Sequence, residues 1–259
     1  MMEGDVFVLS FSGGRTSAYM TDRLLKELPK EKVIVVFANT GKEEPATLDF
    51  VNQCDQLWGG NVVWLEYCPV DKFKIVSYAT ASRNGEPFSA IIAKRNYLPN
   101  VVARYCTQEL KVRCIKRYMQ SLGYRHWTSV IGIRHDEPRR WSKVRGIAER
   151  ECWDVWLPLV DWKVTKEMVL EYWRHMPFDL RLKDYQGNCD LCFLKGKHKL
   201  KRILTENPEK VTWWTEQEGK VNGTFHKGYS YQQLFQLIQK SPTLFDYQDD
   251  DFPCYCNVD

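Results

Sequence analysis

Short apolar runs alternate with segments of helical periodicity along the first two thirds of the chain. Continuous apolar runs rich in β-branched residues are typical of buried parallel strands, whereas apolar residues spaced three and four apart are typical of helices. We predict strands at 6–9, 32–38, 61–66, 127–133 and 155–159. We predict helices between them at 18–25, 43–57, 71–82 and 108–122. This alternation predicts an α/β fold with a doubly wound parallel sheet.

The pattern changes after residue 162, where polar loops separate shorter helical segments. We predict helices at 165–174, at about 195–204 and at about 231–240. We therefore predict two units, an α/β domain at 1–162 and a smaller, mostly helical, cysteine-containing region at 163–259.

The stretch between the first strand and the first helix is made of small and polar residues, S-F-S-G-G-R-T-S at 10–17. Such a loop directs backbone N–H groups and the N-terminus of a helix at an anion. Adjacent glycines let a phosphate approach the backbone, the hydroxyl groups add donors and the arginine adds a cation. An ordinary tight turn with a capping serine is the alternative. The residues predicted to bind phosphate are Ser10, Ser12, Gly13, Gly14, Arg15, Thr16 and Ser17.

Two further loops are predicted at the carboxyl ends of strands, one after the second strand and one after the fourth. Ligands of doubly wound sheets bind beyond the carboxyl ends of the strands, so we expect the three loops to meet at one crevice. Arginine makes bidentate contacts to phosphate and sulfate, although a solvated surface is the commoner setting for a basic run. The residues predicted from these loops are Asn39, Thr40, Gly41, Gly132, Arg134, Arg139 and Arg140.

Composition and charge narrow the class of protein. The 259 residues are 44% hydrophobic and 27% charged, as in a folded protein, and no apolar run is long enough to span a membrane. The N-terminus has no basic segment before its apolar run, so we expect no signal peptide and a cytoplasmic protein. The net charge of +4 is mild. A second basic run at 195–202 suits either a solvated face or a phosphate backbone.

The chain has nine cysteines, an odd number, which in a reducing compartment argues against a disulfide framework. Cys189-x-x-Cys192 has the spacing of a chelating pair, and Cys106 precedes a helix whose dipole favours the thiolate. An iron–sulfur cluster, structural zinc and redox thiols are the interpretations that these cysteines leave open. The cysteines predicted to serve packing are Cys54, Cys68 and Cys152. Cys114 lies two helical turns after Cys106 and is predicted either to pack in the core or to be a weaker ligand.

Five segments together resemble a known superfamily. S-G-G-R-T-S resembles the pyrophosphate loop of the adenine nucleotide alpha hydrolases, commonly written S-G-G-x-D-S. The other four resemble the phosphoadenosine phosphosulfate (PAPS) reductase branch, in order and with similar spacing over about residues 5–200. They are Asn39-Thr40-Gly41 with Glu44, Thr47 and Phe50; Cys106-Thr107 with Leu110-Lys111; Gly132-Ile133-Arg134 with Arg139-Arg140; and Leu157-Pro158-Leu159-Val160-Asp161-Trp162.

The resemblance implies an adenine nucleotide alpha hydrolase-like fold and a bound adenine nucleotide, ATP or PAPS, with Mg²⁺ as an accompanying ion. It further implies a [4Fe–4S] cluster, whose expected ligands are Cys106, Cys189, Cys192 and Cys256. Cys256 or Cys254 would otherwise act as a nucleophile from the tail. The sequence departs from the family pattern in two places. Thr16 stands where the loop usually has Asp, and the tail lacks the E-C-G-x-[HL] segment of the reductases.

The motifs and the departures from the family pattern together leave three functions open. In the first, a thiolate attacks the sulfur of a PAPS-like sulfonucleotide, sulfite leaves and a thiol reductant restores the thiol. The second is an ATP-dependent iron–sulfur sulfurtransferase that adenylylates and thiolates tRNA or DNA with a separate sulfur donor; the paired glycines and the basic run favour it. The third is a nucleotide-binding module without catalysis, which Thr16 and the missing tail segment favour. A homodimer is among the expected assemblies.

Overall fold

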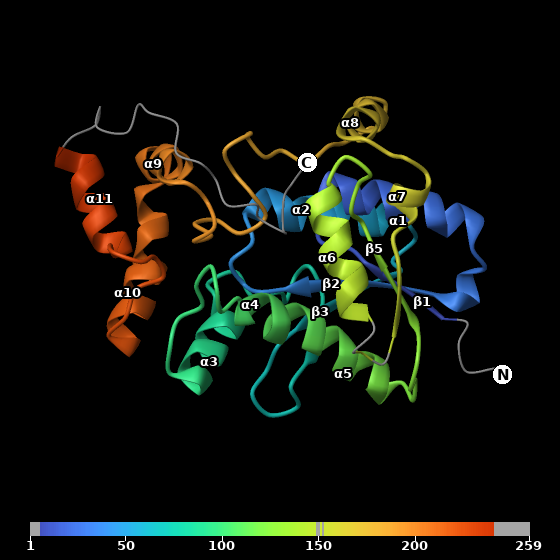
Figure 1. Ribbon diagram of the computed structural model, residues 1–259, viewed down its shortest axis with the longest axis horizontal. Coiled ribbons are helices and arrows are strands. Elements are labelled where there is room, and N and C mark those ends of the chain that lie inside the picture. Colours follow the sequence, from blue (N-terminus) through green and yellow to red (C-terminus); the bar gives the residue numbers. More distant parts are fainter. Residues whose placement is uncertain (1–5, 149–150, 152, 241–259) are drawn as a thin grey trace.

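The computed structural model describes residues 6–148, 151 and 153–240. Its centre is a six-stranded sheet of order β4-β3-β2-β1-β5-β6 (Figure 1). The strands are β1 (Phe7–Ser10), β2 (Val33–Asn39), β3 (Val62–Glu66), β4 (Lys74–Val76), β5 (Thr128–Ile131) and β6 (Asp154–Trp156). Neighbouring strands are parallel, except that β4 runs antiparallel to β3. The predicted α/β class and its doubly wound sheet are confirmed, with one antiparallel edge strand added.

Alternate side chains of the strands enter two cores on opposite faces of the sheet. Leu9, Val35 and Phe37 face the first core, which also contains apolar side chains of four helices. Val8 and Val36 face the other core, together with side chains of the helix at Arg113–Ser121. The helices over the first face are α1 (Arg15–Glu27), α2 (Pro45–Leu57) and α8 (Lys166–Arg174). The opposite face carries α4 (Tyr105–Thr107), the π-helical turn η2 (Gln108–Val112) and α5 (Arg113–Ser121).

The predicted helix at 71–82 is wrong. Residues Lys74–Val76 form β4 instead, and Leu65 pairs with Ile75 in an antiparallel register. The β-branched pair Ile75-Val76 favours an extended backbone. Lys74 also reaches the buried Glu66 carboxylate, with Nζ 3.0 Å from Oε2, and this ion pair holds the edge strand in register.

A separate core, which we name the second core, lies beside the sheet and is built mainly from side chains of the C-terminal helices. Figure 1 shows these helices beside the sheet. Its helices are α3 (Glu86–Arg95), α9 (Lys197–Glu206), α10 (Val211–Val221) and α11 (Tyr231–Lys240). Trp214, Tyr67 and Tyr231 are its largest fully buried side chains. Because α8 packs in the first core, the predicted boundary after residue 162 stays a prediction.

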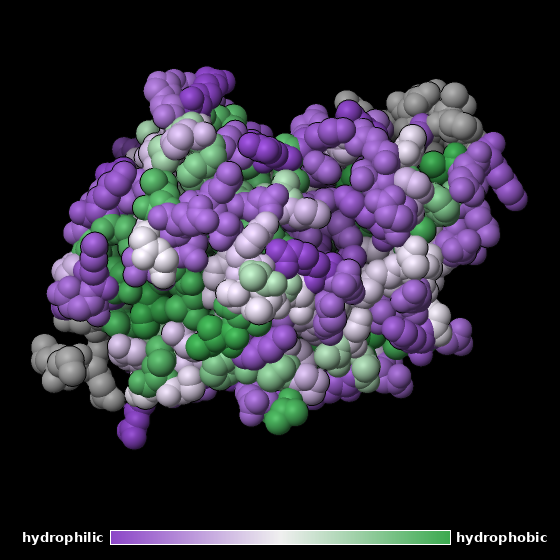
Figure 2. All heavy atoms as spheres, turned by 180° about the vertical axis from the view of Figure 1, so that it is seen from behind, coloured by the Kyte–Doolittle hydropathy of each residue, from purple (hydrophilic) through white to green (hydrophobic). Residues whose placement is uncertain are grey.

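The remaining elements connect these layers. They are α6 (Pro138–Ala148), α7 (Pro158–Asp161), η1 (Lys30–Lys32) and η3 (Pro208–Lys210). Seen from behind, the surface is mainly hydrophilic, with apolar side chains gathered toward one end of that face (Figure 2). Within the described part of the chain, no helix combines the length and the apolar character that crossing a membrane requires.

Candidate functional site at the carboxyl edge of the sheet

The phosphate loop, residues 10–17, joins the end of β1 to the first turn of α1. Gly14 caps α1 in an extended conformation, with φ −102° and ψ 158°. The amide of Ala18 donates to the Gly14 carbonyl at 3.0 Å and begins the helical ladder. In any α-helix the N–H groups that precede this bond point out of the N-terminal end, where the helix dipole favours an anion. The strand–loop–helix geometry is therefore that of an anion site.

Two glycines allow the phosphate loop to pack closely against its neighbours. Gly13 has φ +81°, and a Cβ there would lie 2.7 Å from Thr47 Cγ2 and 3.1 Å from Val51 Cγ2 on α2. Gly132 follows β5, and a Cβ there would lie 2.9 Å from the Cα of Ser17. Real Cβ atoms do not approach other atoms this closely, so both positions require glycine.

Serine hydroxyls brace the loop from within. The amide of Ser12 donates to Ser17 Oγ at 3.1 Å, and the two hydroxyl oxygens are 2.9 Å apart. Ser17 Oγ in turn donates to the Gly14 carbonyl at 3.0 Å. These bonds fix the curvature of the loop.

The side chain of Arg15 points to another partner than the one we expected. It makes a bidentate ion pair with Asp179, at 2.7 and 2.9 Å, and Nη2 also donates to the Leu180 carbonyl at 2.6 Å. Its guanidinium attaches residues 179–180 to the start of α1 rather than facing a phosphate. What Arg15 offers the anion site in this structure is its backbone N–H.

Arg134 brings the arginine segment onto the phosphate loop. Its Nη1 donates to Thr16 Oγ1 at 3.2 Å, and its Nε donates to Asp136 Oδ1 at 2.9 Å. The side chain is only 7% exposed, so these contacts fix the guanidinium in place. A cation is therefore held at the N-terminus of α1, beside the groups that favour an anion.

The other two predicted arginines lie on α6. Arg140 forms an ion pair with Glu137 Oε1, while Oε2 of the same carboxylate accepts the backbone N–H of Arg134 at 3.0 Å. Arg139 is exposed. Arg140 therefore holds the carboxylate that orients the Arg134 backbone. Its link to the phosphate loop runs through Glu137 and Arg134.

The predicted segment Asn39-Thr40-Gly41 lies at the carboxyl end of β2 and is tied into a buried network. Asn39 Nδ2 donates to Glu66 Oε1 at 2.7 Å and to the Ser82 carbonyl at 2.9 Å. The amide and hydroxyl of Thr40 both donate to Glu43 Oε2, at 2.9 and 2.8 Å. Gly41 has φ +78° and a Cβ there would meet Gly85 Cα at 3.1 Å. These side chains shape the floor of the crevice.

Residues 188–192, which we name the cysteine turn, dock onto the loop after β2. Glu43 and Cys189 form an antiparallel bridge, with the Glu44 amide donating to the Asn188 carbonyl at 2.7 Å. Asn188 is 1% exposed, and its Nδ2 donates to the Ser12 carbonyl at 2.8 Å. The turn therefore touches the phosphate loop itself. In the sequence, only the position of Asn188 next to Cys189 connects this residue to the site.

Three ion pairs reinforce this arrangement. Lys42 Nζ lies 2.7 Å from Asp190 Oδ2, with both side chains less than 10% exposed. Lys210 Nζ contacts both carboxylate oxygens of Glu44, at 2.8 and 2.6 Å. The third is the pair of Arg15 and Asp179 described above. Each pair joins a residue near the carboxyl edge of the sheet to a segment beyond residue 178.

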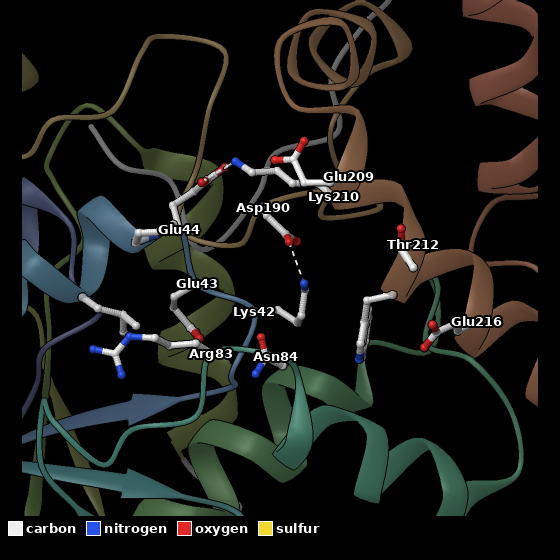
Figure 3. Close-up of a pocket in the computed structure, with 13 residues that line it drawn as sticks. Lys42, Glu43, Glu44, Arg83, Asn84, Asp190, Glu209, Lys210, Thr212 and Glu216 are labelled. Carbon is white, nitrogen blue, oxygen red and sulfur yellow. Dashed lines mark hydrogen bonds and ion pairs between the residues drawn. The ribbon is translucent and has the colours of Figure 1, made fainter.

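A pocket of about 400 Å³ opens beside the crevice, between the loop after β2 and the residues of η3 and α10 (Figure 3). Trp213 lines it, with the Lys42 ammonium 5.1 Å from its ring centroid and its Nε1 donating to Ser89 Oγ at 3.0 Å. Gly85, at φ +81°, leaves room for this indole, since a Cβ there would lie 2.4 Å from Nε1. Figure 3 shows Asp190 facing Lys42 at the centre of the pocket.

The described cysteines do not provide the ligand set of the expected cluster. Across 6–148, 151 and 153–240, no three His, Cys, Asp or Glu side chains come together as metal ligands. Cys106 and Cys192 both pack against the second core. Cys254 and Cys256 lie outside the described residues. The three expected cluster ligands that the structure describes, Cys106, Cys189 and Cys192, therefore do not come together as one ligand set.

The structure describes three of the remaining cysteines, Cys54, Cys68 and Cys114. Cys54 and Cys114 are fully buried, and burial raises the pKa of the Cys54 thiol far above its usual value and that of Cys114 to about 12. Both thiols therefore stay protonated and pack as apolar groups. Cys68 is half-buried and donates to the Phe73 carbonyl at 3.3 Å. Cys152 lies outside the described residues.

Two comparisons place this geometry among known proteins. The family model described as "Phosphoadenosine phosphosulfate reductase domain" matches residues 6–180. The chain is also 31% identical over 214 residues to "Uncharacterized nin region protein ORF290" of Escherichia phage lambda, which covers 74% of this chain and 67% of the phage protein. The matched family range contains the loops after β1, β2 and β5, whereas the cysteine turn lies beyond its end.

Proposed function

The chain belongs to the phosphoadenosine phosphosulfate reductase domain family, and from that starting point we propose that it is an enzyme of adenine nucleotide sulfur chemistry. The nucleotide binds at the carboxyl edge of the sheet, with its phosphates on the backbone N–H groups of the phosphate loop. The reaction is the thiol-dependent reduction of a sulfonucleotide to sulfite. A thiol reductant then restores the enzyme.

The contact between Arg134 and Thr16 is the observation that carries this proposal. It joins two motifs that are 118 positions apart and places a buried guanidinium at the N-terminus of α1. Asp136 holds Nε, so the guanidinium is oriented before any ligand arrives. A fixed guanidinium next to a helix N-terminus suits the dense negative charge of a phosphate–sulfate ester.

The thiol that reacts with the sulfonate has to lie at the same crevice. The cysteine turn supports this requirement, because Asn188 bonds to the Ser12 carbonyl immediately before Cys189. Cys254 and Cys256, the nucleophiles expected from the resemblance, lie outside the described residues and stay a prediction. Mg²⁺ as a companion of the nucleotide stays a prediction as well.

A second candidate, ATP-dependent sulfur transfer to tRNA or DNA, is favoured by α9. This helix begins five residues after Cys192, and its first turn carries Lys197, His198 and Lys199 without an acidic residue. Basic side chains beside a reactive site are what a nucleic-acid backbone would bind. In this reaction ATP would adenylylate an oxygen of the acceptor and pyrophosphate would leave.

Calorimetric titration of the full chain with PAPS, ATP and AMP tests the proposal. Arg134→Ala should weaken PAPS binding by about 30-fold, because a charge-assisted contact to the anion is lost. Arg174→Ala removes an arginine whose side chain is 71% exposed at the end of α8 and serves as the matched control. It should change the affinity less than about twofold.

The outcomes separate the candidates. Sulfite release from PAPS supports the reductase, whereas pyrophosphate release from ATP that RNA or DNA stimulates supports the sulfurtransferase. Tight binding without turnover supports a nucleotide-binding module. If none of the three nucleotides binds, or if both arginine variants lose affinity equally, the anion site is wrongly placed.

A further inference from the structure

The cysteine turn is held at every residue from 188 to 191. Asn188 contacts the phosphate loop, and the Asp190 carboxylate accepts from Trp214 Nε1 at 3.0 Å while pairing with Lys42. The hydroxyl of Tyr231 donates to the Leu191 carbonyl. The backbone that carries both thiols is therefore fixed against the phosphate loop on one side and the second core on the other.

Lys195 bonds to the backbone at both ends of the turn. Lys195 is 9% exposed, and its ammonium donates to the Cys189 carbonyl while its amide donates to the Cys192 carbonyl at 2.9 Å. These two bonds fix the backbone on both sides of the turn. Both thiols are half-buried rather than enclosed, in contrast to Cys54 and Cys114. The turn thus combines a fixed backbone with two partly exposed thiols.

Two cysteines separated by two residues on a turn can form a disulfide with little movement of the backbone. We propose that Cys189 and Cys192 are a redox-active dithiol at the nucleotide crevice, and that this dithiol supplies the two electrons that release sulfite. The substrate in this inference rests on the proposed function, whereas the reversible disulfide does not.

In the proposed step, the dithiol reduces the sulfonate sulfur to sulfite through two successive displacements. The Cys189 thiolate attacks the sulfonate sulfur, a sulfur–sulfur bond forms, and the bond from sulfur to the nucleotide oxygen breaks so that the nucleotide leaves as a phosphate. The Cys192 thiolate then attacks Cys189 Sγ, the disulfide forms and sulfite leaves with the bonding pair. The sulfonate sulfur gains two electrons and the dithiol loses two. The two thiol protons end on the phosphate and the sulfite, and a small-molecule thiol reduces the disulfide.

The first experiment examines the dithiol without nucleotide. The full chain, purified without oxygen, is equilibrated in glutathione buffers of graded potential, labelled with a maleimide and mapped by mass spectrometry. Cys189 and Cys192 should lose and regain the label together, while Cys68 titrates independently. Stoichiometric iron or zinc that Cys189→Ser removes would overturn the dithiol, as would two thiols that never couple.

The second experiment is a single turnover. Pre-reduced protein, freed of reductant, is mixed with PAPS and should release one sulfite per chain and no more. Cys189→Ser should lower this release by about 100-fold, and Cys192→Ser should retain an SO₃ adduct on Cys189 that mass spectrometry detects. Cys68→Ser is the matched control and should release sulfite normally. Sulfite release that survives in Cys189→Ser and depends on Cys256 overturns the inference.

Calorimetry on every variant separates failure of the inference from failure of the proposed function. A chain that binds no PAPS contradicts the proposed function, and the glutathione titration then decides the dithiol by itself. A chain that binds PAPS with wild-type affinity but shows no coupled disulfide contradicts the dithiol alone.

Discussion

The phosphate loop and the cysteine turn meet at one hydrogen bond, from Asn188 to Ser12, yet they are held in place in opposite ways. The loop is fixed by steric fit, since Gly13 and Gly132 leave no room for a side chain. The turn is fixed by polar side chains, above all by the buried pair of Asp190 and Lys42. One wall of the crevice is thus set by backbone shape and the other by charge.

This difference determines which substitutions and solution conditions should destabilise each wall. Steric fit needs only the local backbone and the adjacent elements, so it is indifferent to pH and salt. A buried ion pair has lost its hydration and is stable only while both partners are present. We therefore expect the two walls to fail under different substitutions and different conditions.

The largest effect is expected at the turn. Asp190→Ala leaves the Lys42 ammonium buried without its counterion and should lower the free energy of unfolding by about 4 kcal/mol. Denaturant unfolding at neutral pH measures this loss. Glu27→Ala is the control, because it disrupts an ion pair with Arg23 whose side chains are 45% and 41% exposed, and it should cost about 0.3 kcal/mol. Equal losses in the two variants would show that the turn is not held by charge.

The next effect is expected in the loop. Gly13→Ala forces a Cβ toward Thr47 at a positive φ and should cost about 3 kcal/mol, from strain and overpacking together. Gly60→Ala has nearly the same φ, +76°, but open space around the new methyl group, and should cost only about 1 kcal/mol. Thermal unfolding of both variants isolates the steric part. A similar shift in both would mean that the fit around Gly13 is loose.

A pH-dependent effect is expected on the side of the second core. Burial lowers the pKa of His226 from 6.5 to about 4, so the folded protein keeps this imidazole neutral while the unfolded chain protonates it below pH 6.5. Its contribution to the free energy of unfolding is complete above pH 6.5 and is lost as the pH falls toward 4, by about 3 kcal/mol. His226→Gln should flatten the stability profile over that window. His175→Gln, at a site 73% exposed, should leave the profile unchanged.

The smallest effect tests the role of Arg15. Asp179→Asn weakens a half-exposed bidentate pair and should cost about 1 kcal/mol of stability. Because the Leu180 carbonyl still holds Nη2, the affinity for PAPS should change less than about twofold. A clear gain in PAPS affinity, measured by calorimetry, would show that the released guanidinium serves the phosphate after all.

Features that depend on local pattern could be predicted from the sequence. The apolar runs of β1 and β2, together with Gly13 and Gly14, predict the strand–loop–helix unit from neighbouring residues alone. The structure contains this unit. The segment 71–82 was mispredicted because its strand pairing depends on the free edge of β3, not on its own periodicity. Asp179 and Asn188 could not be predicted, since each acts on a residue more than 160 positions away.

The place of β1 in the sheet also has a consequence for synthesis. β1 lies between β2 and β5, so its second edge receives a partner only when Thr128–Ile131 leave the ribosome. Until nearly half of the chain has emerged, the nascent protein carries an uncovered parallel edge that other chains can pair with. A message truncated before codon 128 would therefore give an aggregating product rather than a smaller version of the fold.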